Sequence, residues 1–173
     1  MMREQGVLQD PKVQKIFALH VAGTMPMGTL ASKEGTLLAG TSSIKILVKG
    51  NGGHAAAPHH TIDPVVTGSK IVVELQTLIS RELSPLESGV ISITMANAGS
   101  ATNVIPSTME LQGTIRSLTS EGISKLQKRV KEVAESIATA NRCEAEVSFP
   151  GNDYPPTVND AGCWELGKSA AKD

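Results

Sequence analysis

The chain has 173 residues with a formal net charge of −1; 40% of the residues are hydrophobic and 19% are charged, as in an ordinary globular protein. The near-zero charge gives no electrostatic reason to expect nucleic acid or an anionic membrane as a partner. No apolar run approaches the roughly 20 residues that span a bilayer, and the first residues lack the apolar core of a signal peptide.

The first predicted element is a buried strand within residues 12–21. Its evidence is the apolar run Ile16-Phe17-Ala18-Leu19, which ends at His20. Functional side chains of α/β folds often lie where a strand leaves the sheet, and neutral imidazole is a common ligand of zinc or manganese. A histidine after an apolar strand is more often structural, so position alone leaves both roles open for His20. Leu37 and Leu38 indicate a short strand further on.

A more regular pattern in the order βαββαβ follows. The predicted strands are 43–49, 90–95, 109–118 and about 145–149, and the predicted helices are 61–82 and 119–140. Alternating apolar residues define the strands; in the second of them, Ile91, Ile93 and Met95 are expected to face the same way. This order predicts an α+β fold of the ferredoxin-like type, a two-layer sandwich in which two helices cover one face of a four-stranded antiparallel sheet.

The two predicted helices differ in their apolar faces. Helix 119–140 has one apolar stripe and a charged opposite side, which is typical of a helix between a sheet and water. Helix 61–82 has two apolar lines, one of Val65, Val72 and Ile79 and one of Ile71, Leu75 and Leu78. So wide an apolar arc implies burial on more than one side. We interpret the extra face as a dimer surface; the alternative is ordinary burial within the chain.

Three of the four histidines lie in one glycine-rich loop, residues 50–60, between a predicted strand and a predicted helix. Its glycines free the backbone just before His54, a composition that packing alone does not call for. An imidazole presented there could donate to an oxyanion, act as an acid or base, or bind a metal. The alternative is that His54 caps the following helix or fills a turn. His59 and His60 are weaker candidates, because the pair has no clear metal-binding geometry.

Asn103 and Arg116 are the candidate residues for binding a carboxylate. Asn103 lies in a loop between two predicted strands, and Arg116 is on the polar face of the strand that follows. A guanidinium can hold a carboxylate through two parallel hydrogen bonds, and an amide can add a third. Placed near the loop histidine, the two would suit an anionic substrate terminus. The alternative is a turn-forming asparagine and a solvated arginine.

The C-terminal part breaks the regular pattern. Residues 154–160 are a turn-rich linker, and Trp164 begins a segment with helical character. Cys143 and Cys163 are far apart and form no CxxC pair, so they indicate neither a disulfide framework nor a zinc knuckle. We therefore expect a reducing compartment and, with no targeting segment in view, a cytoplasmic location.

Several short motifs in order resemble the M20 metallopeptidase family, in particular its amidohydrolase branch of aminoacylases and indole-3-acetic acid–amino acid conjugate hydrolases. The matching runs are Phe17-Ala18-Leu19-His20-Val21, Gly50 to His59, Ile62-Asp63-Pro64, Ser80-Arg81-Glu82, Asn103-Val104-Ile105-Pro106, Gly113-Thr114-Ile115-Arg116 and Pro155-Pro156-Thr157-Val158-Asn159-Asp160. Each run is weak alone, but the ordered set is specific and covers nearly the whole chain.

The resemblance implies that residues 41–153 are a ferredoxin-like lid that forms a homodimer, and that 1–40 and 154–173 are pieces of a metal-binding catalytic domain. His20 matches a metal ligand, and His54 matches a lid histidine that reaches the partner subunit's active site and stabilises the oxyanion. Asn103 and Arg116 match positions that hold the substrate carboxylate. The implied reaction is zinc- or manganese-dependent hydrolysis of an N-acyl or auxin-type amino acid conjugate, in which a glutamate base activates a metal-bound water.

The chain also departs from the family pattern. The other metal ligands and the catalytic glutamate pair of the family have no match here, so we expect the chain alone to bind no metal and to be inactive in hydrolysis. Residues 1–39 and 155–173 would expose apolar surface, and we expect disorder or non-native docking there. The alternative function is a stand-alone ferredoxin-like dimerisation or ligand-binding module without catalysis; a peptidase of the same family, acting on short peptides, would differ only in substrate.

Overall fold

The computed structural model describes residues 5–9, 12–151 and 153–171. The chain forms two compact units. Residues 38–157 form the central unit, and residues 1–37 with 158–173 form the flanking unit. In the described parts of the chain, no helix has both the length and the apolar character needed to cross a bilayer.

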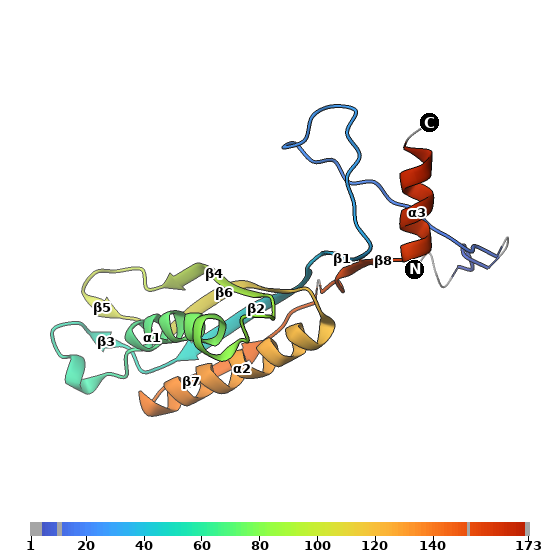
Figure 1. The fold of residues 1–173 in the computed structure, drawn as a ribbon. Coiled ribbons are helices and arrows are strands. Elements are labelled where there is room, and N and C mark those ends of the chain that lie inside the picture. Colours follow the sequence, from blue (N-terminus) through green and yellow to red (C-terminus); the bar gives the residue numbers. More distant parts are fainter. Residues whose placement is uncertain (1–4, 10–11, 152, 172–173) are drawn as a thin grey trace. The chain divides into compact units, whose positions relative to one another are not determined.

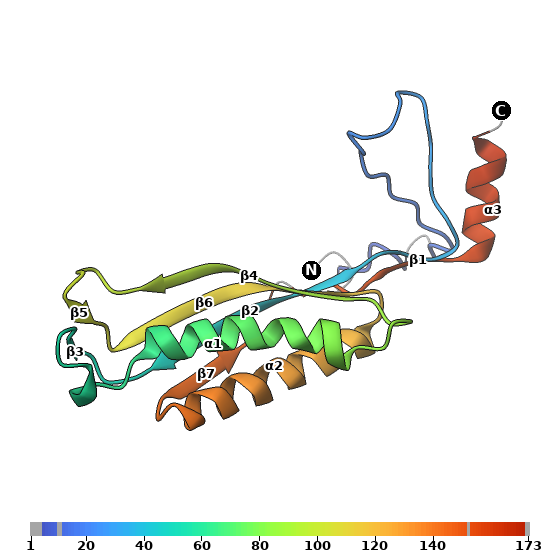
Figure 2. The same cartoon turned by 60° about the vertical axis from the view of Figure 1, so that its left-hand side comes forward.

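The central unit is a four-stranded antiparallel sheet with two long helices on one face (Figures 1 and 2). Its strands are β2 (Gly40–Lys49), β4 (Gly89–Ala98), β6 (Thr108–Ser117) and β7 (Glu144–Ser148), and its helices are α1 (Pro64–Thr77) and α2 (Ser120–Ala140). The spatial order β4-β6-β2-β7 places the first and third strands of the βαββαβ unit in the middle. The predicted α+β, ferredoxin-like fold is therefore confirmed.

The core lies between the sheet and the two helices. Ile44, Ile46 and Val48 alternate on the covered face of β2, as the period of a half-buried strand requires. Leu111 and Ile115 do the same on β6, where every residue from Thr108 to Ser117 pairs with β2. From the helices, Ile71, Leu75, Leu126 and Val130 complete the cluster. Each side chain in this cluster loses nearly all contact with water, which is the main stabilising contribution to the fold.

Helix α1 begins at Pro64, three residues later than the predicted helix 61–82, and its start has a clear cause. Oδ1 of Asp63 accepts hydrogen bonds from the backbone nitrogens of Val65 and Val66, at 2.7 and 3.2 Å. This N-cap excludes Thr61 and Ile62 from the predicted helix 61–82. After Thr77 the helix continues as one π-helical turn, η2 (Leu78–Glu82).

The two apolar lines predicted for helix 61–82, which α1 and η2 now form, are both used inside the chain. Ile71, Leu75 and Leu78 are fully buried, and Val65, Val72 and Ile79 are partly buried against the same core. For these six residues the alternative of burial within the chain is correct. The apolar residues of α1 that stay exposed are Val66 (50%) and Val73 (69%), one heptad apart on the outer side.

Met95 does not face the core with Ile91 and Ile93, and this part of the prediction is wrong. The pairing of β4 with β6 shifts between Ile93 and Met95, so that Ile93 pairs with Gly113 but Met95 pairs with Gln112. The extra residue, Thr94, forms a β-bulge that reverses the alternation beyond it. Met95 is consequently 49% exposed.

The described part of the flanking unit contains the helix α3 (Ala161–Ala170) and most of a two-stranded sheet of β1 (Gly35–Leu38) and β8 (Thr157–Asn159). The short strand expected at Leu37 and the helix expected from Trp164 are both present. The buried strand expected within 12–21 is absent from residues 13–21: Ile16, Leu19 and Val21 are 76, 87 and 93% exposed. A strand needs a neighbour for its backbone hydrogen bonds, and the described residues supply none beside this run.

Candidate functional site

Two loops meet at the end of the central sheet that is opposite to Gly40 (Figure 1). The first follows β2 and contains the two-residue strand β3 (Gly53–His54) and the short 3-10 helix η1 (Pro58–His60). The second joins β4 to β6 and contains β5 (Val104–Ile105). β3 and β5 pair antiparallel, with His54 opposite Val104. This small ribbon ties together two segments that lie about fifty residues apart in the sequence.

The ribbon brings His54 and Asn103 together. Asn103 immediately precedes β5, and its carbonyl oxygen accepts a hydrogen bond of 3.0 Å from the backbone nitrogen of Ala55. Both His54 and Asn103 are exposed. Their proximity is what a shared binding site requires, and tertiary pairing rather than sequence spacing produces it.

The glycines before His54 serve close packing, contrary to the expectation from the sequence. The described glycines with positive φ lie elsewhere in the chain. A β-carbon at Gly50 would stand 2.2 Å from the carbonyl oxygen of Ile62, and one at Gly52 would stand 2.4 Å from that of Ile105. A side chain at Gly52 would force the two loops apart, and one at Gly50 would open the base of the first loop. The glycines therefore allow close contact within the first loop and between the two loops, rather than letting the backbone turn.

His54 makes defined contacts with its own loop. The backbone nitrogen of Ala56 donates to its Nδ1 at 3.1 Å, and its carbonyl oxygen accepts from the backbone nitrogen of Ala57 at 2.9 Å. The N-cap of η1 is Ala57, and no side chain caps that helix. The helix predicted after the loop, α1, is capped by Asp63. The helix-capping alternative for His54 is therefore wrong, whereas Nδ1 does make the local contact of a turn residue. Nε2 is on the opposite side of the ring from this contact.

His59 and His60 lie in η1 and are exposed. Their ring centroids are 4.0 Å apart, with the rings inclined by 48°. Among the described residues, no three His, Cys, Asp or Glu side chains are grouped so that they could hold a metal ion. The residues present therefore do not by themselves fit the zinc or manganese centre that the motifs imply.

A shallow hollow lies beside the ribbon. Its lining residues come from the start of α1 and from the β4–β5 loop: Val65, Ala98, Gly99, Ser100, Ala101, Thr102, Val104 and Pro106. Directly opposite residues of an antiparallel pair project to the same face, so the side chain of His54 is on the side of the ribbon that Val104 occupies. The sequence analysis did not identify this hollow, because its residues are small and carry no chemical signature.

Arg116 is far from the ribbon in the same chain. It is exposed on β6, where it pairs with Thr41 on one side and Val90 on the other. Ser107, whose Oγ accepts from the backbone nitrogen of Gly52 at 3.3 Å, marks the ribbon end of that strand. At about 3.3 Å per residue, roughly 30 Å of β6 separates Ser107 from Arg116. One chain thus brings Asn103, but not Arg116, to His54.

His20 belongs to the flanking unit and is exposed. Its Nδ1 is 2.7 Å from the carbonyl oxygen of Val21. A carbonyl only accepts, so Nδ1 is the donor and Nε2 carries the lone pair of the neutral ring. That is the form in which a histidine binds a metal.

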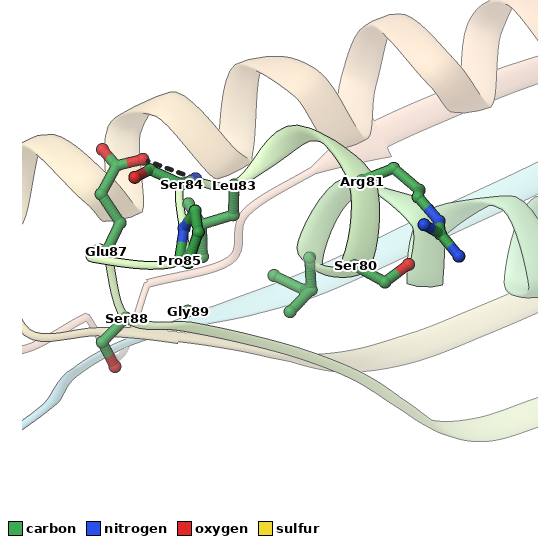
Figure 3. A pocket seen from close by; sticks show the side chains of 9 residues that line it. Ser80, Arg81, Leu83, Ser84, Pro85, Glu87, Ser88 and Gly89 are labelled. Atoms are coloured by element: carbon green, nitrogen blue, oxygen red, sulfur yellow. Dashed lines mark hydrogen bonds between the residues drawn. The ribbon is translucent and has the colours of Figure 1, made fainter.

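A second hollow is where η2 leads into β4 (Figure 3). Figure 3 shows Ser80 and Arg81 of η2 on one side of it and Ser84 and Glu87 on the other. The Glu87 carboxylate accepts from the backbone nitrogen of Ser84 at 3.2 Å and from Nζ of Lys125 at 3.0 Å. The bond from Lys125 is the main reason why the pKa of Glu87 lies below its ordinary value. The carboxylate is therefore already satisfied by structural contacts.

Comparisons with known proteins identify the central unit. Residues 37–149 match the family model of the M20 peptidase dimerisation domain. The chain is 43% identical over 99% of its length to IAA-amino acid hydrolase ILR1-like 2 of Arabidopsis thaliana, and 42% identical over 95% of its length to N-acetyldiaminopimelate deacetylase of Bacillus subtilis. It spans only 39% and 44% of these two relatives.

A solved structure gives the same result. The Bacillus subtilis YXEP protein, described as a dinuclear metal binding peptidase from the M20 family, covers 99% of this chain with 30% identity and a TM-score of 0.76. The chain covers 41% of that protein. The matches extend beyond the central unit and confirm the family predicted from the ordered motifs: the chain belongs to the M20 peptidase dimerisation-domain family.

Proposed function

We propose that this chain is the lid and dimerisation portion, with flanks, of a metal-dependent amidohydrolase that cleaves N-acyl or auxin-type amino acid conjugates. Residues 41–153 are the lid in this proposal, and 1–40 and 154–173 belong to the catalytic domain. The observation that carries the proposal is the β3–β5 ribbon, which holds an exposed His54 beside Asn103 at one end of the lid sheet. The named activities of the relatives, a conjugate hydrolase and a deacetylase, are both amide hydrolyses.

His54 has the chemistry of an oxyanion donor. Hydrolysis of an amide passes through a tetrahedral intermediate with a negatively charged oxygen, and a positioned N–H stabilises that charge. The exposed ring of His54 supplies such a group, and the adjacent Asn103 can add an amide donor to the substrate.

The separation of Arg116 from His54 supports a site shared between two subunits. A small amino acid conjugate is much shorter than the roughly 30 Å of strand between the two residues. Both can therefore contact one substrate only when His54 comes from one subunit and Arg116 from the other. In this arrangement Arg116 grips the substrate carboxylate through its planar guanidinium.

The dimer surface that we propose combines α1 with β4. β4 is an edge strand of the sheet, and α1 packs over β4 and β6 on the same side of the central unit. The exposed Val66 and Val73 of α1 are available for a second copy, as is the outer edge of β4. A second copy would cover both the apolar side chains and the unpaired strand edge.

A single substitution tests this surface. Val73→Glu should convert a dimer into a monomer in sedimentation equilibrium at micromolar concentration, because it places a charge in an apolar contact. Ser136→Glu on the exposed side of α2 is the matched control and should leave the dimer intact. A wild-type chain that is already monomeric at that concentration would contradict the proposal.

Mixing two variants of the full-length enzyme tests the shared site. His54→Ala should lower mainly kcat, and Arg116→Ala should mainly raise KM, since one acts on the transition state and the other on the bound substrate. A hybrid dimer of the two variants has one site with both residues intact. At substrate concentrations well below the raised KM, where each variant alone has little activity, mixing and re-equilibrating the two should thus restore up to about a quarter of the wild-type activity, because half of the dimers are hybrids. No recovery, with hybrid dimers present, would place both residues in the same subunit's site or in none.

The metal centre and the location of the enzyme remain parts of the proposal. His20 would be one ligand of divalent ions, zinc or manganese, whose function is to polarise the amide and supply a nucleophile. The remaining ligands have no counterpart in the described structure, so we expect the purified chain to show no hydrolysis with either ion; measurable metal-dependent turnover would refute this. Cys143 and Cys163 are free thiols, which fits a reducing, cytoplasmic environment.

A further inference from the structure

The hydrogen bond between Ala56 and His54 determines more than the position of the ring. A backbone nitrogen carries a proton and can only donate, so Nδ1 of His54, at 3.1 Å from it, must accept. A neutral imidazole has one protonated nitrogen, and when Nδ1 accepts, the proton is on Nε2. We propose that the main-chain N–H of Ala56 is a positioning group that holds neutral His54 in the Nε2–H tautomer.

The loop keeps the Ala56 N–H in place. On one side, the backbone nitrogen of Ala55 donates to the carbonyl oxygen of Asn103 at 3.0 Å; on the other, that of Ala57 donates to the carbonyl oxygen of His54 at 2.9 Å. These two bonds restrain the peptide units on both sides of Ala56. The direction of its N–H, and with it the plane of the ring, is thereby fixed by the β3–β5 ribbon.

The backbone contact of His20 is of the opposite kind and implies the opposite tautomer. There, Nδ1 faces a carbonyl oxygen, that of Val21, and must donate. His20 consequently has its proton on Nδ1 and its lone pair on Nε2, whereas His54 has the reverse. Two histidines of one chain are set for opposite chemistry, one as an acceptor and one as a donor at Nε2.

The catalytic meaning of this tautomer rests on the proposed function. An oxyanion is stabilised by an N–H and repelled by a lone pair. The Nε2–H tautomer presents the donor on the edge of the ring that points away from the loop, so it needs no reorganisation when charge develops. Loss of the Ala56 N–H would let the ring populate the Nδ1–H tautomer, which presents the lone pair instead.

Nitrogen-15 NMR on this chain tests the proposal without substrate. At mildly alkaline pH, where imidazoles are neutral, a scalar coupling across the hydrogen bond should connect the Ala56 amide nitrogen to Nδ1 of His54. The ring nitrogen shifts should assign the proton to Nε2. Absence of the coupling together with tautomer-averaged shifts would overturn the proposal.

Two variants of Ala56 distinguish the effect of its backbone N–H from that of its side chain. Ala56→Pro removes the donor and should abolish the coupling and raise the Nδ1–H population; Ala56→Gly keeps the donor and should leave both unchanged. An unchanged tautomer in Ala56→Pro would contradict the proposal. If proline disturbs the ribbon, seen as lost contacts between His54 and Val104, the wild-type coupling alone decides.

The two proposals fail in different ways. A wild-type coupling with no recovery in the mixing experiment would leave the tautomer assignment standing and remove its role in catalysis. Recovery on mixing without the coupling would keep the shared site and remove Ala56 as its positioning group.

Discussion

Gly50 and Ile62 are in such close contact that a β-carbon on the glycine would stand 2.2 Å from the carbonyl oxygen of Ile62. Next to this contact, Asn51 and Ile62 exchange two backbone hydrogen bonds of 2.8 Å each. The contact closes the base of the loop that carries His54. It therefore links the stability of the fold to the geometry of the site.

Gly50→Ala should destabilise the chain by about 1–3 kcal/mol, because the new methyl group must displace backbone rather than a flexible side chain. Urea unfolding monitored by circular dichroism measures the change. Gly151→Ala is the control: a β-carbon there meets nothing within 4 Å, so its effect should stay below about 1 kcal/mol. Equal effects at the two positions would show that close packing is not the reason for Gly50.

Leu111→Ala should cost about 2–5 kcal/mol, because it opens a cavity in the middle of the core. Leu111 is fully buried on the central strand β6. Leu86, which is 98% exposed, provides the matched deletion; Leu86→Ala should change stability by less than about 0.5 kcal/mol. Urea unfolding compares the two variants, and similar losses of stability in both would contradict the placement of Leu111 in the core.

Asp63→Ala should lower stability by about 0.5–2 kcal/mol through loss of the α1 N-cap. Asp63→Asn should retain most of the stability, since asparagine caps helices about as well as aspartate. Thermal unfolding of the two variants distinguishes capping from a purely electrostatic role. An asparagine variant as unstable as the alanine variant would favour the electrostatic explanation.

Stability should fall in acid partly through Glu82. Arg129 of α2 donates from Nε and Nη2 to the two carboxylate oxygens of Glu82, at 2.8 and 2.9 Å, and ties η2 to α2. These bonds are the main reason why the pKa of Glu82 lies below its ordinary value of 4.5. The folded chain thus binds a proton less readily than the unfolded chain, so the stabilisation is complete above pH 4.5 and is lost as the pH falls through the lowered pKa.

Glu82→Gln provides the measurement for this pair. Its melting temperature should lie below that of the wild type at neutral pH, and the difference should shrink as the pH falls below 4.5. High salt should reduce the difference as well, because the pair is exposed. A difference that does not depend on pH would exclude the ion pair as its cause.

Most of the fold could be predicted from local patterns, and the errors have local causes. The alternation in β2 and β6 and the one-sided stripe of α2 correctly predicted which faces pack against each other. Met95 was misassigned because a bulge depends on pairing with a neighbour. The run 16–19 is apolar enough for a buried strand. Strand formation also needs a neighbouring strand as a hydrogen-bonding partner, and the pattern of apolar residues does not show whether one is present.

The candidate site was only partly predictable. Residue types and motif order singled out His54 and Asn103, and the structure brings the two together through β3 and β5. The same motifs grouped Arg116 with them, although nearly the full length of β6 lies between. The predicted strand 109–118 already puts Arg116 near the end remote from Asn103, but the sequence does not tell which end of that strand the His54 loop shares; the pairing of β3 with β5 decides it.

The sequence by itself determined the βαββαβ order through its periodicity, and the resemblance of its ordered motifs indicated the family and the residues capable of the chemistry. Only the tertiary structure decided that the glycines serve close contact, that α1 uses both predicted apolar lines within the chain, and that Ala56 selects the form of His54. The physical reason is the same in each case. Each depends on which groups come into contact in the folded chain, as in the pairing of β3 with β5, and a periodicity in the sequence does not report such contacts.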